Sequence, residues 1–227
     1  HFDYVLPGRT SQSFAYETVG RKLVMDFLNG YNATIVMYGQ TGSGKTHTMF
    51  GPTGEQMPET ALDGPPPKHL GIVPRAVHEV LLANESRRAR GKKTTLSVSY
   101  VEIYGSDVTD LLRDGKRVGH NKVGSTKYVL DKKCAVEVKS LQEVYHLLNV
   151  GDLQKRKAAT AMNDRSSRAH ALFILNLDME DEATNVCVRS QLFLADLGGS
   201  EQVKRSKVHH GHTSTDGGFT MGKNMRE

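Results

Sequence analysis

Hydrophobic residues recur at helical spacing in three stretches of the chain. These stretches cover residues 11–28, 74–83 and 140–148, and each predicts a helix. The first helix is expected to end at Asn29-Gly30, which is a helix-stop signal. Its apolar residues are expected to be Phe14, Val19, Leu23, Val24 and Phe27.

Two of these helices also carry start signals. Pro74 would lie in the first turn of the second helix, where a missing N–H is tolerated. Ser140 and Glu143 match a capping box, in which each residue satisfies a free backbone N–H at the helix start.

β-Branched and aromatic residues are concentrated in other stretches, which predict strands. Residues 34–38 predict a buried strand, and residues 95–104 predict a central strand because apolar residues occur on both faces. Residues 52–67, rich in Gly and Pro, predict an irregular loop. Further strands are expected over residues 129–138, 169–179 and 188–195. Without an internal repeat or a linker, this order predicts one α/β domain around a mixed sheet.

Composition fits a single domain. A chain of 227 residues with 37% hydrophobic residues can bury one sizeable core. No long apolar run predicts a transmembrane helix, and the first residues do not resemble a signal peptide. The cysteines, Cys134 and Cys187, form no CxxC pair, which indicates reduced thiols in an intracellular protein.

The net charge of +5 hints at an acidic partner. Charge alone does not choose between a nucleic acid, a membrane surface and an acidic protein. The basic run over residues 87–93 has no interleaved aromatic residues, which favours a solvated turn over a nucleic-acid patch.

The most informative motif is the run from Gly39 to Thr46, which reads G-x-x-x-x-G-K-T. It follows the strand predicted over 34–38 and precedes a helix expected to open at Lys45. This arrangement aims backbone N–H groups and a helix N-terminus at one anion. In such a loop the lysine reaches the β- and γ-phosphates, and the Thr46 hydroxyl ligates Mg²⁺. An ordinary glycine turn is the weaker alternative, so the motif predicts binding of a nucleoside triphosphate.

Two further segments are candidates for the same site. The strand ending at Ala195 is followed by Asp196 and two glycines, and an aspartate there can hold Mg²⁺ through water. A glycine after it can offer its N–H to the γ-phosphate, which would make the loop a switch. A plain β-turn is the alternative. Residues 163–170 pair two hydroxyls with an arginine, although that string alone is also typical of a polar loop.

Together these segments resemble the kinesin motor domain. Tyr38 to Met49 is similar to the phosphate loop of that family, Asn163 to His170 to its first switch, and Asp196 to Glu201 to its second. The resemblance covers essentially the whole chain. It implies a P-loop NTPase fold with a central mixed, mainly parallel β-sheet flanked by helices. It also implies an ATP-hydrolysing motor that requires Mg²⁺, binds microtubules and is found in the cytoplasm on the cytoskeleton.

The resemblance also implies a role for individual residues. Thr46 and, through water, Asp196 would hold Mg²⁺, while His47 would pack against the adenine. Arg168 and Glu201 would form an ion pair between the switches, with a constitutive structural salt bridge as the alternative. The nucleotide-binding residues would be Gly39, Gln40, Thr41, Gly42, Ser43, Gly44, Lys45, Thr46 and His47. The catalytic residues would be Ser166, Ser167, Arg168, Gly199 and Glu201.

The segment after the second switch is expected to be mobile and to meet the acidic surface of tubulin. Lys204, Arg205 and Lys207 would make this contact, and the alternative is a spacer without any contact. Three histidines within residues 209–212 lack a nearby cysteine or paired carboxylate, which favours a solvated loop over a metal site.

The chain also departs from the family pattern. Ala169 and Gly198 replace the usual Ser and Ala of the two switches, and Gly198 is expected to loosen the second. Residues 1–227 are expected to be a partial motor domain, without the first strand and without the C-terminal microtubule-binding helices and neck. Dimerisation is possible through segments outside this chain, and no direct nucleic-acid partner is expected.

Two other functions remain as alternatives to the motor. The first alternative is a non-motile kinesin-related scaffold. A small-GTPase-like switch or P-loop kinase is the second, although a GTPase would require an NKxD motif that the sequence lacks.

Overall fold

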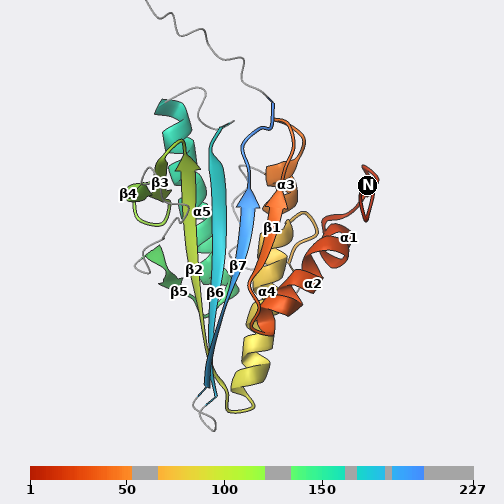
Figure 1. Cartoon of the computed structure of the whole chain (residues 1–227), viewed down its shortest axis with the longest axis vertical. Helices are drawn as coiled ribbons and strands as arrows, with labels where there is room; N and C mark the ends of the chain where they lie inside the picture. Colours follow the sequence, from red (N-terminus) through yellow and green to blue (C-terminus); the bar gives the residue numbers. More distant parts are fainter. Residues whose placement is uncertain (53–65, 121–133, 162–167, 182–185, 202–227) are drawn as a thin grey trace, which may run out of the picture.

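The structure is a computed structural model that describes residues 1–52, 66–120, 134–161, 168–181 and 186–201 (Figure 1). Its helical elements are α1 (Gln12–Ala15), the π-helical turn η1 (Tyr16–Gly20), α2 (Arg21–Leu28), α3 (Lys45–Met49), α4 (Ile72–Arg88) and α5 (Leu141–Ala161). Its strands are β1 (Ala33–Met37), β2 (Lys93–Tyr104), β3 (Asp107–Asp110), β4 (Lys116–His120), β5 (Val136–Glu137), β6 (His170–Asp181) and β7 (Val186–Asp196). No described helix is both long and apolar enough to cross a membrane.

The strands form one mixed sheet in the order β1-β7-β6-β2-β3-β4, with β5 paired to β2. The expectation of a mixed sheet is confirmed, but the expectation of a mainly parallel sheet is wrong for the described strands. Only β1 and β7 pair in parallel, and every other described pair is antiparallel. The reason is connection length, since β2–β3 and β6–β7 are joined by short segments that can link only antiparallel neighbours.

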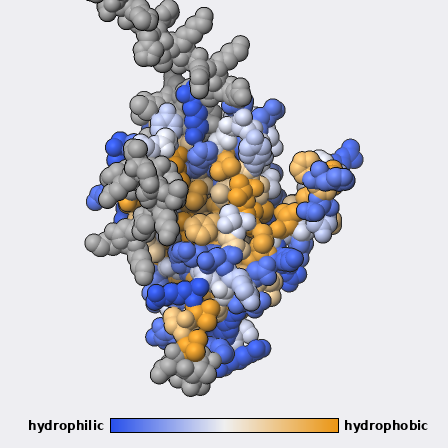
Figure 2. All heavy atoms as spheres, in the orientation of Figure 1, coloured by the Kyte–Doolittle hydropathy of each residue, from blue (hydrophilic) through white to orange (hydrophobic). Residues whose placement is uncertain are grey.

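The described helices cover one face of this sheet. Helix α4 packs against both α2 and α5, and α4 and α5 lie behind the strands in Figure 1. The sheet residues that face them are buried, and one row of these paired residues runs across four strands as Ile35, Leu194, Phe173 and Tyr100. Apolar residues also gather at the centre of the opposite face (Figure 2). On that side, Val36 of β1 is 50% exposed, so β1 is not the fully buried strand that its sequence predicts.

The predicted first helix exists but contains a π-helical turn. Ser11 caps its start by accepting a hydrogen bond from Phe14 N–H, and Asn29-Gly30 ends it, with Gly30 at φ 95°. Val24 and Phe27 are fully buried as expected, whereas Phe14 is 57% and Val19 38% exposed. A π-turn adds a residue to the helix. A constant helical period therefore assigns residues before and within this turn, such as Phe14 and Val19, to the wrong face.

The other predicted elements are present with different lengths. Helix α4 extends beyond residues 74–83 at both ends, and α5 extends far beyond residue 148. At the start of α5, Ser140 Oγ accepts from Glu143 N–H at 3.2 Å, but the Glu143 carboxylate accepts from Lys139 N–H at 2.7 Å and not from Ser140. Of the strand predicted over 129–138, the described residues 134–138 form a strand only at β5. Residues 121–133 lie outside the described part of the chain, as do residues 53–65 of the predicted loop.

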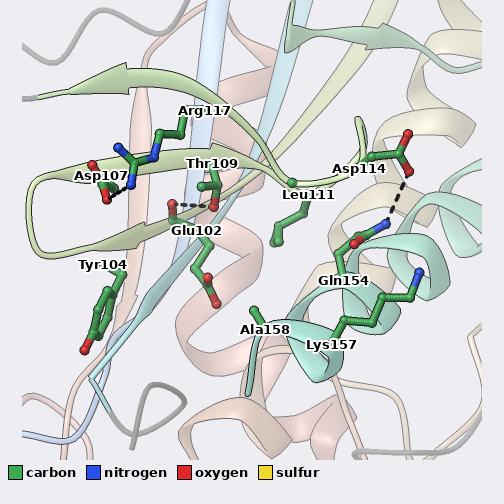
Figure 3. Close-up of a pocket in the computed structure, with 11 residues that line it drawn as sticks. Glu102, Tyr104, Asp107, Thr109, Leu111, Asp114, Arg117, Gln154, Lys157 and Ala158 are labelled. Carbon is green, nitrogen blue, oxygen red and sulfur yellow. Dashed lines mark hydrogen bonds and ion pairs between the residues drawn. The ribbon is translucent and has the colours of Figure 1, made fainter. Parts of the chain in front are cut away.

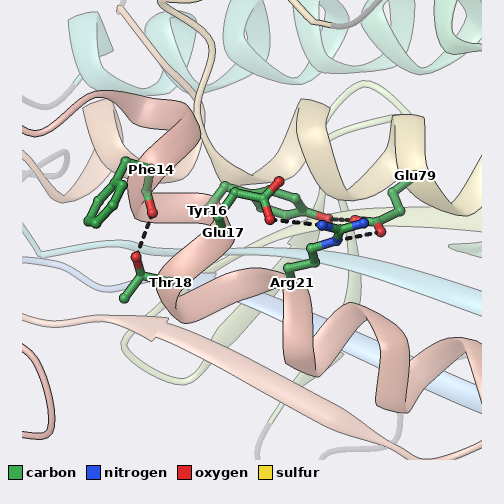
Figure 4. A network of polar contacts seen from close by, with 6 residues as sticks. All are labelled: Phe14, Tyr16, Glu17, Thr18, Arg21 and Glu79. Carbon is green, nitrogen blue, oxygen red and sulfur yellow. Dashed lines mark hydrogen bonds and ion pairs between the residues drawn. The ribbon is translucent and has the colours of Figure 1, made fainter.

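A polar network holds the N-terminal helical arm, residues 11–28, against α4 (Figure 4). Arg21 donates to Glu79 of α4 at 3.0 Å and to Glu17 at 2.9 Å, and the Tyr16 hydroxyl donates to the same Glu79. Burial is the main cause that raises the pKa of Tyr16 far above its usual value, so the hydroxyl remains a donor. Tyr16 and Arg21 of the arm therefore contact the Glu79 carboxylate of α4 directly, and Glu17 is linked to it through Arg21.

Candidate phosphate-binding site

The sheet brings the two main candidate loops together. Met37 at the end of β1 is the register partner of Asp196 at the end of β7, and the two strands run parallel. Their carboxyl ends therefore lie side by side, which is where open α/β sheets bind ligands. The segment from Gly39 to Gly44 leaves one strand, and the segment from Leu197 to Glu201 leaves the other.

Glycines are required inside the first loop. Gly42 has φ 77° and Gly44 has φ 89°, a left-handed conformation that is strained for residues with a side chain. Gly44 directly precedes α3, which begins at Lys45 as the sequence predicts. The ammonium of Lys45 lies across the loop and donates to the carbonyls of Gly39 at 2.9 Å and Gln40 at 2.8 Å. The lysine charge is therefore located at the cradle formed by the loop.

Thr46 and Asp196 are in direct contact. Thr46 Oγ1 donates to Asp196 Oδ2 at 2.6 Å, and the Asp196 side chain is buried. The other carboxylate oxygen, Oδ1, is buried without a hydrogen-bond partner. Buried acceptors normally have a partner, and a carboxylate beside a hydroxyl is the oxygen chemistry that Mg²⁺ prefers. These residues fit the predicted Mg²⁺.

A closed metal cage is not present among the described residues, where no group of three or more His, Cys, Asp or Glu side chains could hold a metal ion. Mg²⁺ often binds through only one or two protein oxygens, with water and substrate phosphates as the other ligands. The pair of Thr46 and Asp196 is consistent with that mode.

The second loop packs against the first through backbone and side-chain contacts. Ser200 N–H donates to the Gly39 carbonyl at 3.0 Å, and Thr41 N–H donates to Glu201 Oε2 at 2.9 Å. The Thr41 hydroxyl donates to the other oxygen of Glu201, which is the main cause that lowers the pKa of this carboxyl below its usual value. A side chain at Gly199 would collide with the Thr41 hydroxyl and the Glu201 carboxylate, so it would displace the contact between these two side chains.

His47 has a partner that sequence reasoning missed. Gln12 Nε2 lies 2.7 Å from the His47 carbonyl oxygen and 3.0 Å from His47 Nδ1. The two residues are 35 positions apart, and no local pattern connects a glutamine at a helix start with a histidine after a phosphate loop. Only the three-dimensional packing of α1 beside α3 reveals this contact.

The first switch is described only in part. Arg168 is exposed just before β6, and His170 Nδ1 accepts a 3.0 Å hydrogen bond from Gly198 N–H of the second loop. Ser166 and Ser167 lie outside the described residues, as do Lys204, Arg205 and Lys207. The ion pair between Arg168 and Glu201 stays a prediction, and in this structure the Glu201 carboxylate accepts from Thr41.

Two cavities lie away from the candidate site. One of about 490 Å³ separates β2, β3 and β4 from α5 and contains side chains of both charges, including an ion pair between Arg117 and Asp107 at 2.8 Å (Figure 3). Another of about 510 Å³ lies where the ends of α2 and α4 meet β6 and β7. None of the described candidate site residues lines either cavity. The chemistry of the phosphate loop, and not cavity size, identifies the candidate site.

Comparison with known proteins gives a consistent result. The family model for the kinesin motor domain matches residues 1–220. The chain is 37% identical over 213 residues to carboxy-terminal kinesin 2 of Xenopus laevis, covering 91% of this chain and 31% of that protein. It is 36% identical over 208 residues to human kinesin heavy chain isoform 5C, covering 90% of this chain and 20% of that protein.

A solved structure is similar as well. The structure of a fast kinesin, whose title refers to its ATPase mechanism and its interactions with microtubules, matches with a TM-score of 0.77 and 33% sequence identity. The match covers 92% of this chain and 56% of that chain. This chain thus spans about a fifth to a third of the length of the two relatives named above.

Proposed function

Because this chain belongs to the kinesin motor domain family, we propose that it binds ATP with Mg²⁺, hydrolyses it, and uses this cycle for movement along microtubules. The observation that carries the proposal is the contact between Thr46 and Asp196, which joins the phosphate loop to the second switch beside an unpartnered carboxylate oxygen. Mg²⁺ bound there would neutralise the developing charge on the phosphates.

The phosphate loop binds and orients the triphosphate. Backbone N–H groups from Gln40 to Thr46 surround the phosphates, and the Lys45 ammonium exchanges its loop carbonyls for phosphate oxygens. Thr46 would hold Mg²⁺ directly, and Asp196 would hold it through water. His47 lies at the edge of the loop and packs against the adenine.

The second loop responds to the γ-phosphate. The Gly199 N–H would contact the γ-phosphate, and the hydroxyls of Ser166 and Ser167 would supply further contacts to this phosphate and to Mg²⁺. The hydrogen bonds from Thr41 lower the pKa of the Glu201 carboxyl below its usual value, which is itself well below neutral pH, so the carboxyl is ionised. The carboxylate can therefore accept a proton relayed from the attacking water. When Arg168 pairs with Glu201, the water is enclosed. An exposed ion pair adds little stability, so its value is catalytic.

The microtubule contact is proposed for the segment that follows Glu201. Lys204, Arg205 and Lys207 come within a few positions of the catalytic glutamate in the sequence. A filament with an acidic surface attracts such charges, and docking would act directly on the loop from Asp196 to Glu201.

ATP turnover by the full-length protein, measured with and without microtubules, tests the proposal. We expect turnover that depends on Mg²⁺ and rises when microtubules are added. Binding of ATP without turnover in either condition would contradict the proposal and favour a nucleotide-binding scaffold. Lys45→Ala serves as the inactive control, because any activity left in that variant comes from a contaminant.

A further inference from the structure

The contact between Gln12 and His47 joins two elements that the candidate site does not otherwise connect. From it we infer that Gln12 is a positioning residue, which fixes both the plane of the His47 ring and the nitrogen that carries its proton. The role of this ring toward a nucleotide base rests on the proposed function, whereas the fixed ring is a property of the protein alone.

The orientation of the Gln12 amide follows from simple chemistry. The His47 carbonyl oxygen can only accept a hydrogen bond, so the Gln12 atom 2.7 Å away must be the amide nitrogen and not the amide oxygen. The flipped amide would place two acceptors against each other. The amide nitrogen is also the atom that lies 3.0 Å from His47 Nδ1.

This orientation determines the tautomer of His47. An amide NH₂ group has two hydrogens and no acceptor lone pair. One hydrogen goes to the His47 carbonyl, and the other goes to Nδ1. His47 Nδ1 must therefore be unprotonated, so the neutral ring carries its proton on Nε2. A doubly protonated ring would lose the hydrogen bond from Gln12.

The position of Gln12 is itself well supported. Ser11 caps the helical arm just before it, through a 3.2 Å hydrogen bond from Phe14 N–H. One turn later, the network of Tyr16, Arg21 and Glu79 fastens the same arm to α4 (Figure 4). On the other side, the His47 carbonyl also accepts from Gly51 N–H at 2.9 Å, which fixes the end of α3. Both partners are thus held by their own elements before any ligand arrives.

The fixed ring has a consequence for ligand recognition. With Nδ1 occupied by Gln12, His47 presents its aromatic face and an Nε2–H donor. A neutral heteroaromatic base can stack on such a face. Without Gln12, the ring would rotate among rotamers and exchange tautomers, and ordering it would weaken binding of the base. Binding of the phosphates would be unaffected, since their contacts come from the phosphate loop.

The first experiment reads the tautomer directly. Nitrogen NMR of the ¹⁵N-histidine-labelled protein without nucleotide should show an unprotonated Nδ1 and a protonated Nε2 for His47. Gln12→Leu, which removes the donor without adding a charge or an acceptor, should let both neutral tautomers of His47 appear. Gln154→Leu in α5 removes a glutamine amide from a remote position and should leave the His47 signals unchanged. A protonated Nδ1 in the parent protein would overturn the inference.

The second experiment reads the effect on the base. Gln12→Leu should weaken ATP binding about threefold to tenfold, the loss expected for a neutral hydrogen bond that orders a contact group. Binding of inorganic tripolyphosphate, which has no base, should be unchanged. Equal ATP affinity in Gln12→Leu and the parent protein would overturn the positioning role. A parent protein that binds neither ligand would instead contradict the proposed function, and the NMR result would still decide the tautomer.

Discussion

Thr46 and Asp196, which are 150 residues apart in the chain, are joined by a hydrogen bond of 2.6 Å between Oγ1 and Oδ2. Thr46 lies in the first turn of the helix after the phosphate loop, and Asp196 ends the neighbouring strand. A single hydroxyl therefore connects the part of the site that holds phosphate with the part that is proposed to sense it.

Replacing this hydroxyl should separate metal binding from phosphate binding. Thr46→Ala removes the donor and one proposed ligand of Mg²⁺, so we expect ATP binding in the presence of Mg²⁺ to weaken about tenfold to a hundredfold. ATP binding in the presence of a chelator should change little. Thr46→Ser keeps the hydroxyl and is the matched control. Titration of all three proteins with and without Mg²⁺ makes the comparison, and an undiminished Mg²⁺ effect in Thr46→Ala would contradict the assignment.

The lysine of the loop should matter more than any other single side chain for ATP. Lys45→Ala removes charge-assisted hydrogen bonds to phosphate, so ATP affinity should fall about a hundredfold or more. Because the ammonium contacts only loop carbonyls among the described residues, thermal unfolding of the variant should stay close to that of the parent. Isothermal titration checks the first expectation and a melting curve checks the second. Normal affinity with normal folding would remove Lys45 from the site.

Glu201 should be needed for turnover and not for binding. Glu201→Ala removes the carboxylate that is proposed to relay a proton from water, and we expect ATP to bind while hydrolysis stops. Single-turnover hydrolysis, followed after mixing with excess protein, measures the chemical step separately from release. Hydrolysis at the parent rate would show that the Thr41 contact of Glu201 is structural only.

Tyr145 offers a prediction about stability. Its hydroxyl is buried without a hydrogen-bond partner, and burial raises its pKa to about 12. Tyr145→Phe removes the unsatisfied group, so the variant should be as stable as the parent or more stable by about 1 kcal/mol in urea denaturation. A loss of several kcal/mol would mean that the hydroxyl has a partner.

The same hydroxyl gives a pH dependence with a defined sign. An unfolded tyrosine ionises near pH 10, whereas folded Tyr145 stays neutral up to about pH 12. Above the lower value the unfolded chain binds fewer protons than the folded chain, so stability should decline as the pH rises from 10 to 12. Tyr145→Phe should show a shallower decline over this interval.

The basic segment after the second switch should act on filament binding alone. Neutralising Lys204, Arg205 and Lys207 together in the full-length protein should weaken microtubule binding and reduce its dependence on salt. ATP binding without microtubules should remain nearly unchanged. Cosedimentation over a series of salt concentrations tests this, and unaltered affinity throughout would support a spacer.

The sequence was sufficient to predict the site loops because their chemistry is local. Gly42 and Gly44 are needed where the loop turns, and Asp196 directly ends a strand, so each is readable from a few neighbours. The pairing of Gln12 with His47 depends on how two helices pack, which no short pattern encodes. The exposed Phe14 was misplaced for a related reason, since the π-turn that follows it has no clear sequence signal. The strand directions follow from the lengths of the connections, which the family resemblance does not specify, and the short β2–β3 and β6–β7 connections make these neighbours antiparallel.

The register between β1 and β7 has consequences for how variants of this protein should be interpreted. Ile35 and Leu194 are partners in the core, two residues before Met37 and Asp196. Strands advance about 3.3 Å per residue, so slippage of this pair by one position would move Asp196 out of reach of the Thr46 hydroxyl. A bulky or polar substitution at either core position could therefore abolish nucleotide binding without altering any group that touches ATP. In a mutational screen, such positions would be mistaken for ligand contacts unless the sheet itself were examined.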